Sequence, residues 1–260
     1  MESALNTASI AEGIGISLDE VVIRVLAEVQ ARARAAGAGY PFSLNGTVLR
    51  TSDWKTRPTY VFCLLLSYYS WKPKQWNCRP AQLFEELCTG AAQLFVGGKA
   101  VRFGFPRADV TLHSTFRTAV DRLCNTHLGE GKGYSGEKAL SSKDDGLDIV
   151  AWKDHADGRS GKIVLFGACA AGHDWDQKVH ELNPVSFCHQ WMQKTPPSHI
   201  VKMFFLPHRI EPDRWDKLTR DAGIVFDRCR IAACSPTLPG PSTFGDPMAW
   251  CEKALTDLGA

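Results

Sequence analysis

The stretch that decides the fold reads Lys143-Asp144-Asp145-Gly146-Leu147-Asp148-Ile149-Val150-Ala151-Trp152-Lys153, and Lys162-Ile163-Val164-Leu165-Phe166 follows it. Acids open onto one apolar run, and a polar turn over 154–161 leads to a second. This pattern predicts a β-hairpin with carboxylates at the mouth of its first strand. Carboxylates at a strand end suit a hard divalent cation, and such a cation supports phosphodiester hydrolysis. A solvated acidic turn explains the same segment equally well.

The composition is that of an ordinary globular protein. The chain has 260 residues, of which 44% are hydrophobic and 22% charged, so it can bury a sizeable core in one large domain or in one domain with an added helical segment. The net charge is only +2. No global basic field therefore points to nucleic acid, although a local basic patch is compatible with this balance.

Cysteine usage indicates a reducing compartment. The nine cysteines are scattered and odd in number, no CxxC pair occurs, and the N-terminus has no secretory pattern. Cys229 and Cys234 are close in sequence, but no second pair completes a zinc site. The longest apolar run, Tyr60 to Tyr69, is too short to span a bilayer. We therefore expect a cytoplasmic protein with reduced thiols and no membrane partner.

Strand and helix patterns alternate across 146–232, which predicts an α/β core with a helical N-terminal portion packed on it. Apolar periodicity, caps and breakers predict helices over 18–36, 80–96, 113–127, 184–192, 213–222 and 246–258. Besides the hairpin, strands are expected over 100–105, 200–206, 224–226 and 229–232. Residues 59–69 fit either a buried helix or a buried strand, and residues 40–54 look irregular. We place the N-terminal portion at 1–78 and the α/β domain at 79–260.

The order of these elements resembles that of a known superfamily. The chain has a helix with Glu85-Glu86, then a strand that carries Asp148, a second hairpin strand and a further helix. This order is similar to that of the PD-(D/E)xK nucleases. More narrowly, 145–152 and 166–175 look like nuclease-like proteins of bacterial anti-phage defence loci. The resemblance covers roughly 80–206 and implies a restriction-endonuclease-like mixed sheet flanked by helices.

The resemblance also implies roles for individual residues. Asp148 would be the central metal-binding carboxylate, Glu85 or Glu86 would be the acid from the preceding helix, and the cofactor would be Mg²⁺ or Mn²⁺. The second strand should then offer Glu or Gln, one residue, and Lys. This chain has Ala168-Cys169-Ala170 there, so both functional side chains of the pattern are missing.

Three explanations of this departure stay open. Lys178, about one and a half turns into the next helix, replaces the missing strand lysine; or Ala168 stands where an active protein has Gln; or the domain is a pseudo-nuclease. The first two make the chain a metal-dependent DNA endonuclease, an effector of anti-phage defence. The third makes it a non-catalytic module that binds nucleic acid or assembles with a partner.

Contacts to DNA are expected from Lys132, Lys138 and Lys143 around a glycine-rich loop, and from His173. A solvated loop is at least as good a reading for the lysines, and Asp174 beside His173 is more typical of a helix N-cap than of a binding site. Tryptophans 152 and 175 could stack on bases, but core packing is the commoner role. The near-neutral charge favours a partner protein of a defence complex, or a homo-oligomer, that supplies part of the binding surface.

Overall fold

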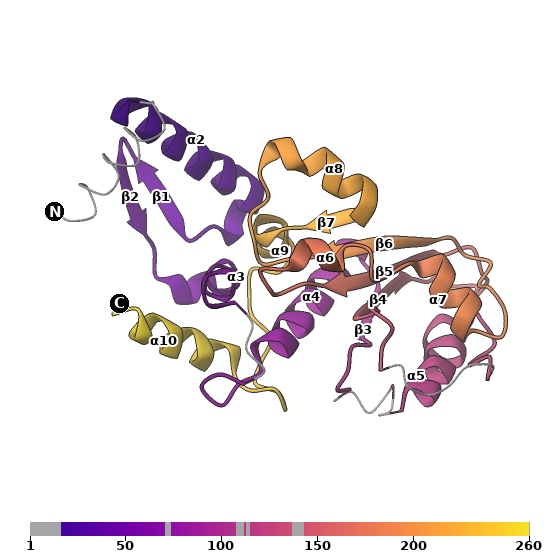
Figure 1. The fold of residues 1–260 in the computed structure, drawn as a ribbon. Helices are drawn as coiled ribbons and strands as arrows, with labels where there is room; N and C mark the ends of the chain where they lie inside the picture. The colour runs from indigo at the N-terminus through magenta and orange to yellow at the C-terminus, as the bar shows by residue number, and fades with distance from the viewer. Residues whose placement is uncertain (1–16, 71–73, 108–111, 113–114, 137–142, 260) are drawn as a thin grey trace.

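The computed structural model describes residues 17–70, 74–107, 112, 115–136 and 143–259 (Figure 1). The N-terminal portion is less purely helical than expected. Helix α2 (Leu18–Ala36) and a short turn, η1 (Gly37–Gly39), lead to an antiparallel hairpin of β1 (Phe42–Asn45) and β2 (Val48–Thr51). Residues 40–54 are thus partly a hairpin rather than irregular, because Gly46 supplies a left-handed turn between two short strands. The turn η2 (Trp54–Thr56) follows.

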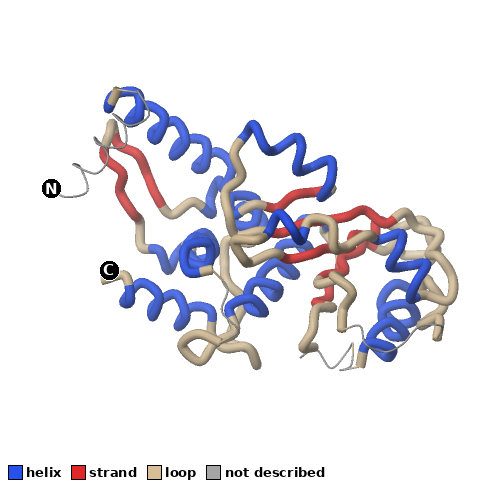
Figure 2. Tube along the Cα trace, viewed as in Figure 1, coloured by secondary structure: helices blue, strands red, loops and turns tan. Residues whose placement is uncertain are grey.

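The main sheet has the strand order β3-β4-β5-β6-β7, and Figure 2 shows the strands in red among the helices. Its strands are β3 (Lys99–Arg102), β4 (Ile149–Lys153), β5 (Ile163–Cys169), β6 (Ile200–Phe205) and β7 (Ile224–Phe226). The predicted hairpin is confirmed: β4 pairs antiparallel with β5, with Ile149 opposite Gly167 and Lys153 opposite Ile163. Strand β3 is antiparallel to β4, whereas β6 and β7 extend the sheet in parallel to β5. The fold is therefore α/β with an open mixed sheet.

Helices cover both faces of this sheet (Figure 1). One face packs against α3 (Pro58–Tyr69), α4 (Pro80–Val96), α9 (Arg228–Cys234) and α10 (Pro247–Asp257). The other packs against α5 (Phe116–Arg122), η3 (Leu123–Leu128), α7 (Pro184–Trp191) and α8 (Pro212–Ala222). Successive side chains of a strand point to opposite faces, so Ile149 and Ala151 join the first layer, and Val150 and Trp152 join the second.

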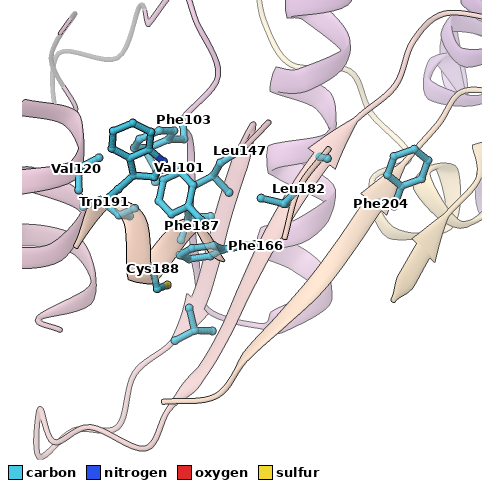
Figure 3. Close-up of a cluster of buried hydrophobic side chains, with 14 of the residues drawn as sticks. Val101, Phe103, Val120, Leu147, Phe166, Leu182, Phe187, Cys188, Trp191 and Phe204 are labelled. Atoms are coloured by element: carbon cyan, nitrogen blue, oxygen red, sulfur yellow. The ribbon is translucent and has the colours of Figure 1, made fainter. Parts of the chain in front are cut away.

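The second layer is held by aromatic packing. Phe103 and Phe166 lie against the α7 side chains Phe187 and Trp191 (Figure 3), with edge-to-face ring contacts between Phe187 and both Phe103 and Phe166. These side chains are almost completely buried. Such contacts fix α7, and the loop before it, relative to the mouth of the hairpin.

Three expectations about elements need correction. Residues 229–232 are not a strand but part of α9, because Asp227 accepts a hydrogen bond from Arg230 N and so caps a helix start. The helix expected over 113–127 begins at Phe116 after the cap of Thr115, continues as the π-helical η3, and has residues 113–114 outside the described part. The region 59–69 is helical, as α3 with Pro58 at its first position.

The first core layer includes residues from both sides of position 78. Val61, Phe62 and Leu66 of α3 belong to the same buried cluster as Leu83, Phe84 and Leu87 of α4. Helix α4 therefore shares one buried cluster with the sheet and with α3. Among the described residues, no helix has the length and apolar character needed to cross a membrane.

Candidate functional site

A cavity of about 250 Å³ opens where the start of β4 and the end of β5 meet helix α4. Carboxylates, a lysine and the end of β5, where the family pattern would place its lysine, come together at this cavity. The side chains that line it are Ala81, Gln82, Phe84, Glu85, Asp144, Asp148, Ala168, Cys169, Ala171, Lys178 and Glu181, with Gly146. Of the residues singled out on the sequence, Asp148, Glu85, Lys178 and position 168 meet here.

The main chain positions Asp148. Its Oδ2 accepts a hydrogen bond of 2.7 Å from the backbone N–H of Cys169 on the neighbouring strand. Its own N–H donates to Gly167 O at 2.9 Å, and its carbonyl accepts from Phe103 N at 2.7 Å and Gly104 N at 3.0 Å. Two segments, strand β5 and the residues directly after β3, therefore fix this residue, and its carboxylate lies at the edge where the strands begin and end.

Glu85 approaches the same place from helix α4. Its Oε2 lies 2.5 Å from Nη2 of Arg102, and the exposed fractions of the two side chains are only 12% and 8%. Arg102 is the last residue of β3, and its Nη1 donates to Pro106 O at 2.7 Å. The glutamate is thus held by a buried ion pair between the helix and the edge strand.

The two carboxylates converge on one point beside Gly104. A Cβ atom at this glycine would lie 2.5 Å from Glu85 Oε2 and 3.0 Å from Asp148 Oδ1. Any side chain at position 104 would therefore collide with the glutamate. The absence of a Cβ leaves a small space between two acidic oxygens, which is the kind of cradle that a cation can fill.

Burial makes this pair of acids electrostatically costly. Burial raises the pKa of Asp148 well above its usual range, and the charge of Glu85 raises it further. Burial also raises the pKa of Glu85 to about 7, although Arg102 opposes the shift. Two close carboxylates in a largely buried site disfavour the doubly charged state. A bound cation would reverse that preference.

Lys178 lies close enough to act on both acids. It lines the cavity, and its positive charge lowers the pKa values of Glu85 and Asp148 against the larger effect of burial. The helix that carries it, α6 (Trp175–Lys178), is a single turn, so Lys178 is its last residue and not one and a half turns in. Asp174 precedes α6 but its side chain makes no capping hydrogen bond.

Other predicted residues lie elsewhere. Glu86 points away from the cavity, and its Oε2 accepts a hydrogen bond of 2.8 Å from Ser242. His173 is exposed and sits beside His208, with ring centroids 5.5 Å apart, outside the cavity lining. Glu86 is therefore not brought to Asp148, although the sequence could not separate it from Glu85.

The lysines of the glycine-rich loop are not gathered at the site. Lys132 is exposed and does not line the cavity. Lys143 is exposed beside Asp144 at the rim, with its Nζ 5.6 Å from the ring centroid of Phe105. Lys138 lies outside the described residues. Trp152 is buried and its Nε1 donates to Asp154, so it is a core residue rather than a stacking platform.

Sequence reasoning missed Arg102, Gly104 and Glu181 as neighbours of the site. Asp144 was seen only as one acid of a cluster, yet its Oδ2 accepts from Phe105 N at 3.1 Å and so ties the hairpin mouth to the segment after β3. Asp145, by contrast, accepts from Trp191 Nε1 at 2.7 Å and supports the loop. The only sequence signal for Gly104 is a glycine within the short strand expected over 100–105, a position that is typical of a bulge or of close backbone approach.

The site offers oxygen ligands, the type that a hard cation prefers, but it offers only a few of them. Glu85 and Asp148 offer carboxylate oxygens, with Asp144 and the carbonyls at the end of β5 nearby. Within the described part of the chain, no group of three or more His, Cys, Asp or Glu side chains has the arrangement of a metal site. Glu85 and Asp148 are the residues that could hold a cation, and with so few protein ligands such a cation would keep several of its waters, as Mg²⁺ commonly does.

The chain matches no family model, no curated protein and no solved structure in the comparisons made. The geometry of the cavity and the resemblance noted in the sequence are therefore the grounds on which a function can be proposed for this chain. Because a fold alone does not carry a function, the residues that line the cavity are the proper basis for a proposal.

Proposed function

We propose that this protein is a metal-dependent endonuclease that hydrolyses phosphodiester bonds in DNA. The observation that carries the proposal is the convergence of Glu85 Oε2 and Asp148 Oδ1 beside Gly104, with Lys178 in the same cavity. DNA as the substrate, and a role as an effector of anti-phage defence, come from the resemblance to PD-(D/E)xK nucleases. They form part of the proposal on that basis.

Each residue has a distinct task in this mechanism. Asp148 and Glu85 would hold Mg²⁺ or Mn²⁺, with Asp148 oriented by the Cys169 N–H and Glu85 by Arg102. The cation, when bound, supplies activation of a water nucleophile and stabilisation of the leaving oxygen. The Lys178 ammonium would orient the attacking water and balance negative charge that develops on the phosphate. The contact with DNA would be made through phosphates, without sequence readout.

A second candidate is a non-catalytic module that keeps the fold. Two observations favour it: Ala168-Cys169-Ala170 brings no carboxylate, amide or ammonium to the cavity, and Arg102 already neutralises Glu85 without a cation. In this reading the chain binds nucleic acid or a partner protein, or forms a homo-oligomer, and the buried acids are a relic of the fold.

The deciding experiment is incubation of the purified chain with plasmid DNA and Mg²⁺ or Mn²⁺, with and without Ala168→Gln. The proposal expects nicking or linearisation by the parent, or by the Ala168→Gln variant alone if position 168 is the missing ligand. An Asp148→Asn derivative of the active chain controls for a contaminating nuclease. Failure of both chains to cut, with DNA retained in a gel-shift assay, would favour the binding module.

A further inference from the structure

Arg102 lies between two acids that belong to two different cavities. On one side its Nη2 contacts Glu85 Oε2 at 2.5 Å, at the wall of the candidate site. On the other side it lines a second cavity of about 440 Å³, together with Glu86, Thr89, Ser242 and Phe244. The guanidinium therefore lies between Glu85 of the candidate site and the adjoining cavity.

The hydrogen-bonding capacity of this guanidinium is only partly used. Nη1 donates to Pro106 O, and the group stacks over the ring of Phe244 with its centre 4.6 Å from the centroid. Within the described residues, Nε makes no hydrogen bond, and the partner of Nη2 is Glu85 Oε2, in the ion pair. A buried arginine with unused donors has other partners to gain if it moves.

The second cavity offers such a partner. Glu86 lies on its wall, and burial raises the pKa of this carboxyl while the charge of Arg102 opposes the rise. Glu86 Oε2 is bonded to Ser242, and its other oxygen accepts no side-chain hydrogen bond that the structure describes. The same guanidinium thus faces an acid on either side of α4, one in the candidate site and one outside it.

We propose that Arg102 is a movable counter-charge: it pairs with Glu85 when the site holds no cation, and turns toward Glu86 in the adjoining cavity when a divalent cation binds Glu85. The inference rests on the proposed function for its cation. The physical reason is that a guanidinium and a divalent cation repel each other and would compete for one carboxylate. The rotation removes the competitor from Glu85, because Glu86 supplies a second, partly buried acid. Glu86 is thereby a positioning residue that acts through Arg102.

The test is calorimetric titration of the full chain with Mn²⁺, for the parent, Arg102→Gln, Glu86→Gln and the double variant. Loss of the competitor in Arg102→Gln should tighten Mn²⁺ binding by about ten-fold or more. Loss of the alternative acid in Glu86→Gln should weaken binding by roughly three-fold. In the double variant the Glu86→Gln effect should vanish, because Arg102 is no longer there to be moved.

The double variant distinguishes movement of Arg102 from a direct effect of the Glu86 charge on the cation. A direct, through-space effect of the Glu86 charge would weaken binding equally with and without Arg102, and that result would overturn the movement. Unchanged or weaker binding by Arg102→Gln would overturn the competition. If parent binding is abolished by Asp148→Asn but not strengthened by Arg102→Gln, the cation site stands and this inference alone fails. No binding by any of the chains overturns both.

A measurement on the unmodified residue covers the case in which Arg102→Gln does not fold. In arginine-labelled parent protein, Mg²⁺ should shift one guanidinium Nε–H resonance, which Arg102→Lys removes from the spectrum. The shift should be lost in Asp148→Asn. An Arg102 resonance that does not respond to saturating Mg²⁺ would overturn the proposal.

Discussion

An aspartate lies directly beyond each end of strand β4, and the two carboxylates differ in their partners and in the direction of their pKa shifts. Asp154, at the turn, accepts from Lys162 at 2.6 Å, from Lys99 at 3.2 Å and from Trp152 Nε1 at 3.0 Å. These partners outweigh partial burial and hold the pKa of Asp154 below its usual range. Asp148, at the mouth, has a raised pKa and its carboxylate forms no ion pair within the described residues.

The difference distinguishes an acid that stabilises the fold from an acid that the fold leaves uncompensated. A structural carboxylate is surrounded by donors and lowers the free energy of the folded state. A carboxylate that is buried beside another carboxylate raises it, and such groups gather at functional sites. The following predictions test whether Asp154 stabilises the fold while Asp148 serves a function.

The largest effect is expected for cleavage by Asp148→Asn. The amide keeps an oxygen for the Cys169 N–H but loses the charge that a cation requires, so the rate should fall on the order of 10³-fold. Asp154→Asn, the matched change at the other end, should leave the rate essentially unchanged. Plasmid cleavage by the active parent is the assay, and equal rates for both variants would remove the functional distinction.

Next in size is the effect of Lys178→Ala. Because the ammonium lies in the cavity with both acids, its loss should lower the cleavage rate by about 10²-fold with the fold intact. Lys132→Ala is the control, since this exposed loop lysine does not line the cavity. Circular dichroism melts should be alike for both variants. A Lys178→Ala protein that cuts normally would exclude it as the substitute for the strand lysine.

At the turn, Asp154→Ala should destabilise the protein instead. It leaves the ammonium of Lys162, which is only 6% exposed, without its closest acid. The free energy of unfolding in urea should fall by about 2 kcal/mol. Asp148→Asn, measured in parallel without divalent cations, should not lose stability, since it removes an unfavourable buried charge. A large loss for Asp148→Asn would show that this acid is structural too.

Gly104→Ala should separate cation binding from folding at the mouth. The new methyl group would enter the space between Glu85 Oε2 and Asp148 Oδ1, so Mn²⁺ affinity should fall by about ten-fold. In Gly90→Ala the added methyl meets nothing within 4 Å, and this helical position should gain up to about 1 kcal/mol. Normal Mn²⁺ binding by Gly104→Ala would place the cation elsewhere.

The effect of pH on stability has opposite signs at the two ends of β4. Glu85 has a folded-state pKa of about 7 against 4.5 for the free group, so the folded state binds the extra proton between these values. Stability from Glu85 is present below pH 4.5 and is lost as pH rises toward 7. For Asp154, with a lowered pKa, stability is present above the unfolded value of 3.8 and is lost as pH falls.

Urea unfolding at several pH values checks this sign. Relative to the parent, Glu85→Gln should become progressively more stable between pH 4.5 and 7, by about 1 kcal/mol or more for each unit of pKa difference. Asp154→Asn should instead lose its disadvantage below pH 4. A parent and a Glu85→Gln variant with the same pH dependence would contradict the raised pKa.

The hairpin and most helices were predictable because their signals are local. Alternation of acids, apolar runs and turn residues marks β4 and β5, and Gly, Pro and cap residues mark helix ends. Asp148 could be named for the same reason. The short α9 was misread, because its apolar run carries too few residues to show a helical period and its cap, Asp227, looked like a loop acid.

The composition of the site depends on contacts that no local pattern contains. Arg102 reads as an ordinary polar strand residue, and it meets Glu85 only through the pairing of β3 with β4, in which Arg102 lies opposite Ile149. The choice between Glu85 and Glu86 depends on the rotation of α4, which the packing of its buried side chains in the first core layer sets. Gly104 matters only because the carboxylates of Glu85 and Asp148, from two other elements, lie next to it.

The anchoring of Asp148 by main-chain groups has a consequence for how such proteins diverge. The N–H groups of Cys169, Phe103 and Gly104 survive almost every substitution of their side chains, so genetic drift can erase a catalytic residue without displacing the aspartate. A lineage that loses hydrolysis would keep the same acidic mouth for a long time. In such a lineage the loss of activity would show as substitutions at positions 168 and 178, while the backbone around the aspartate would stay the same.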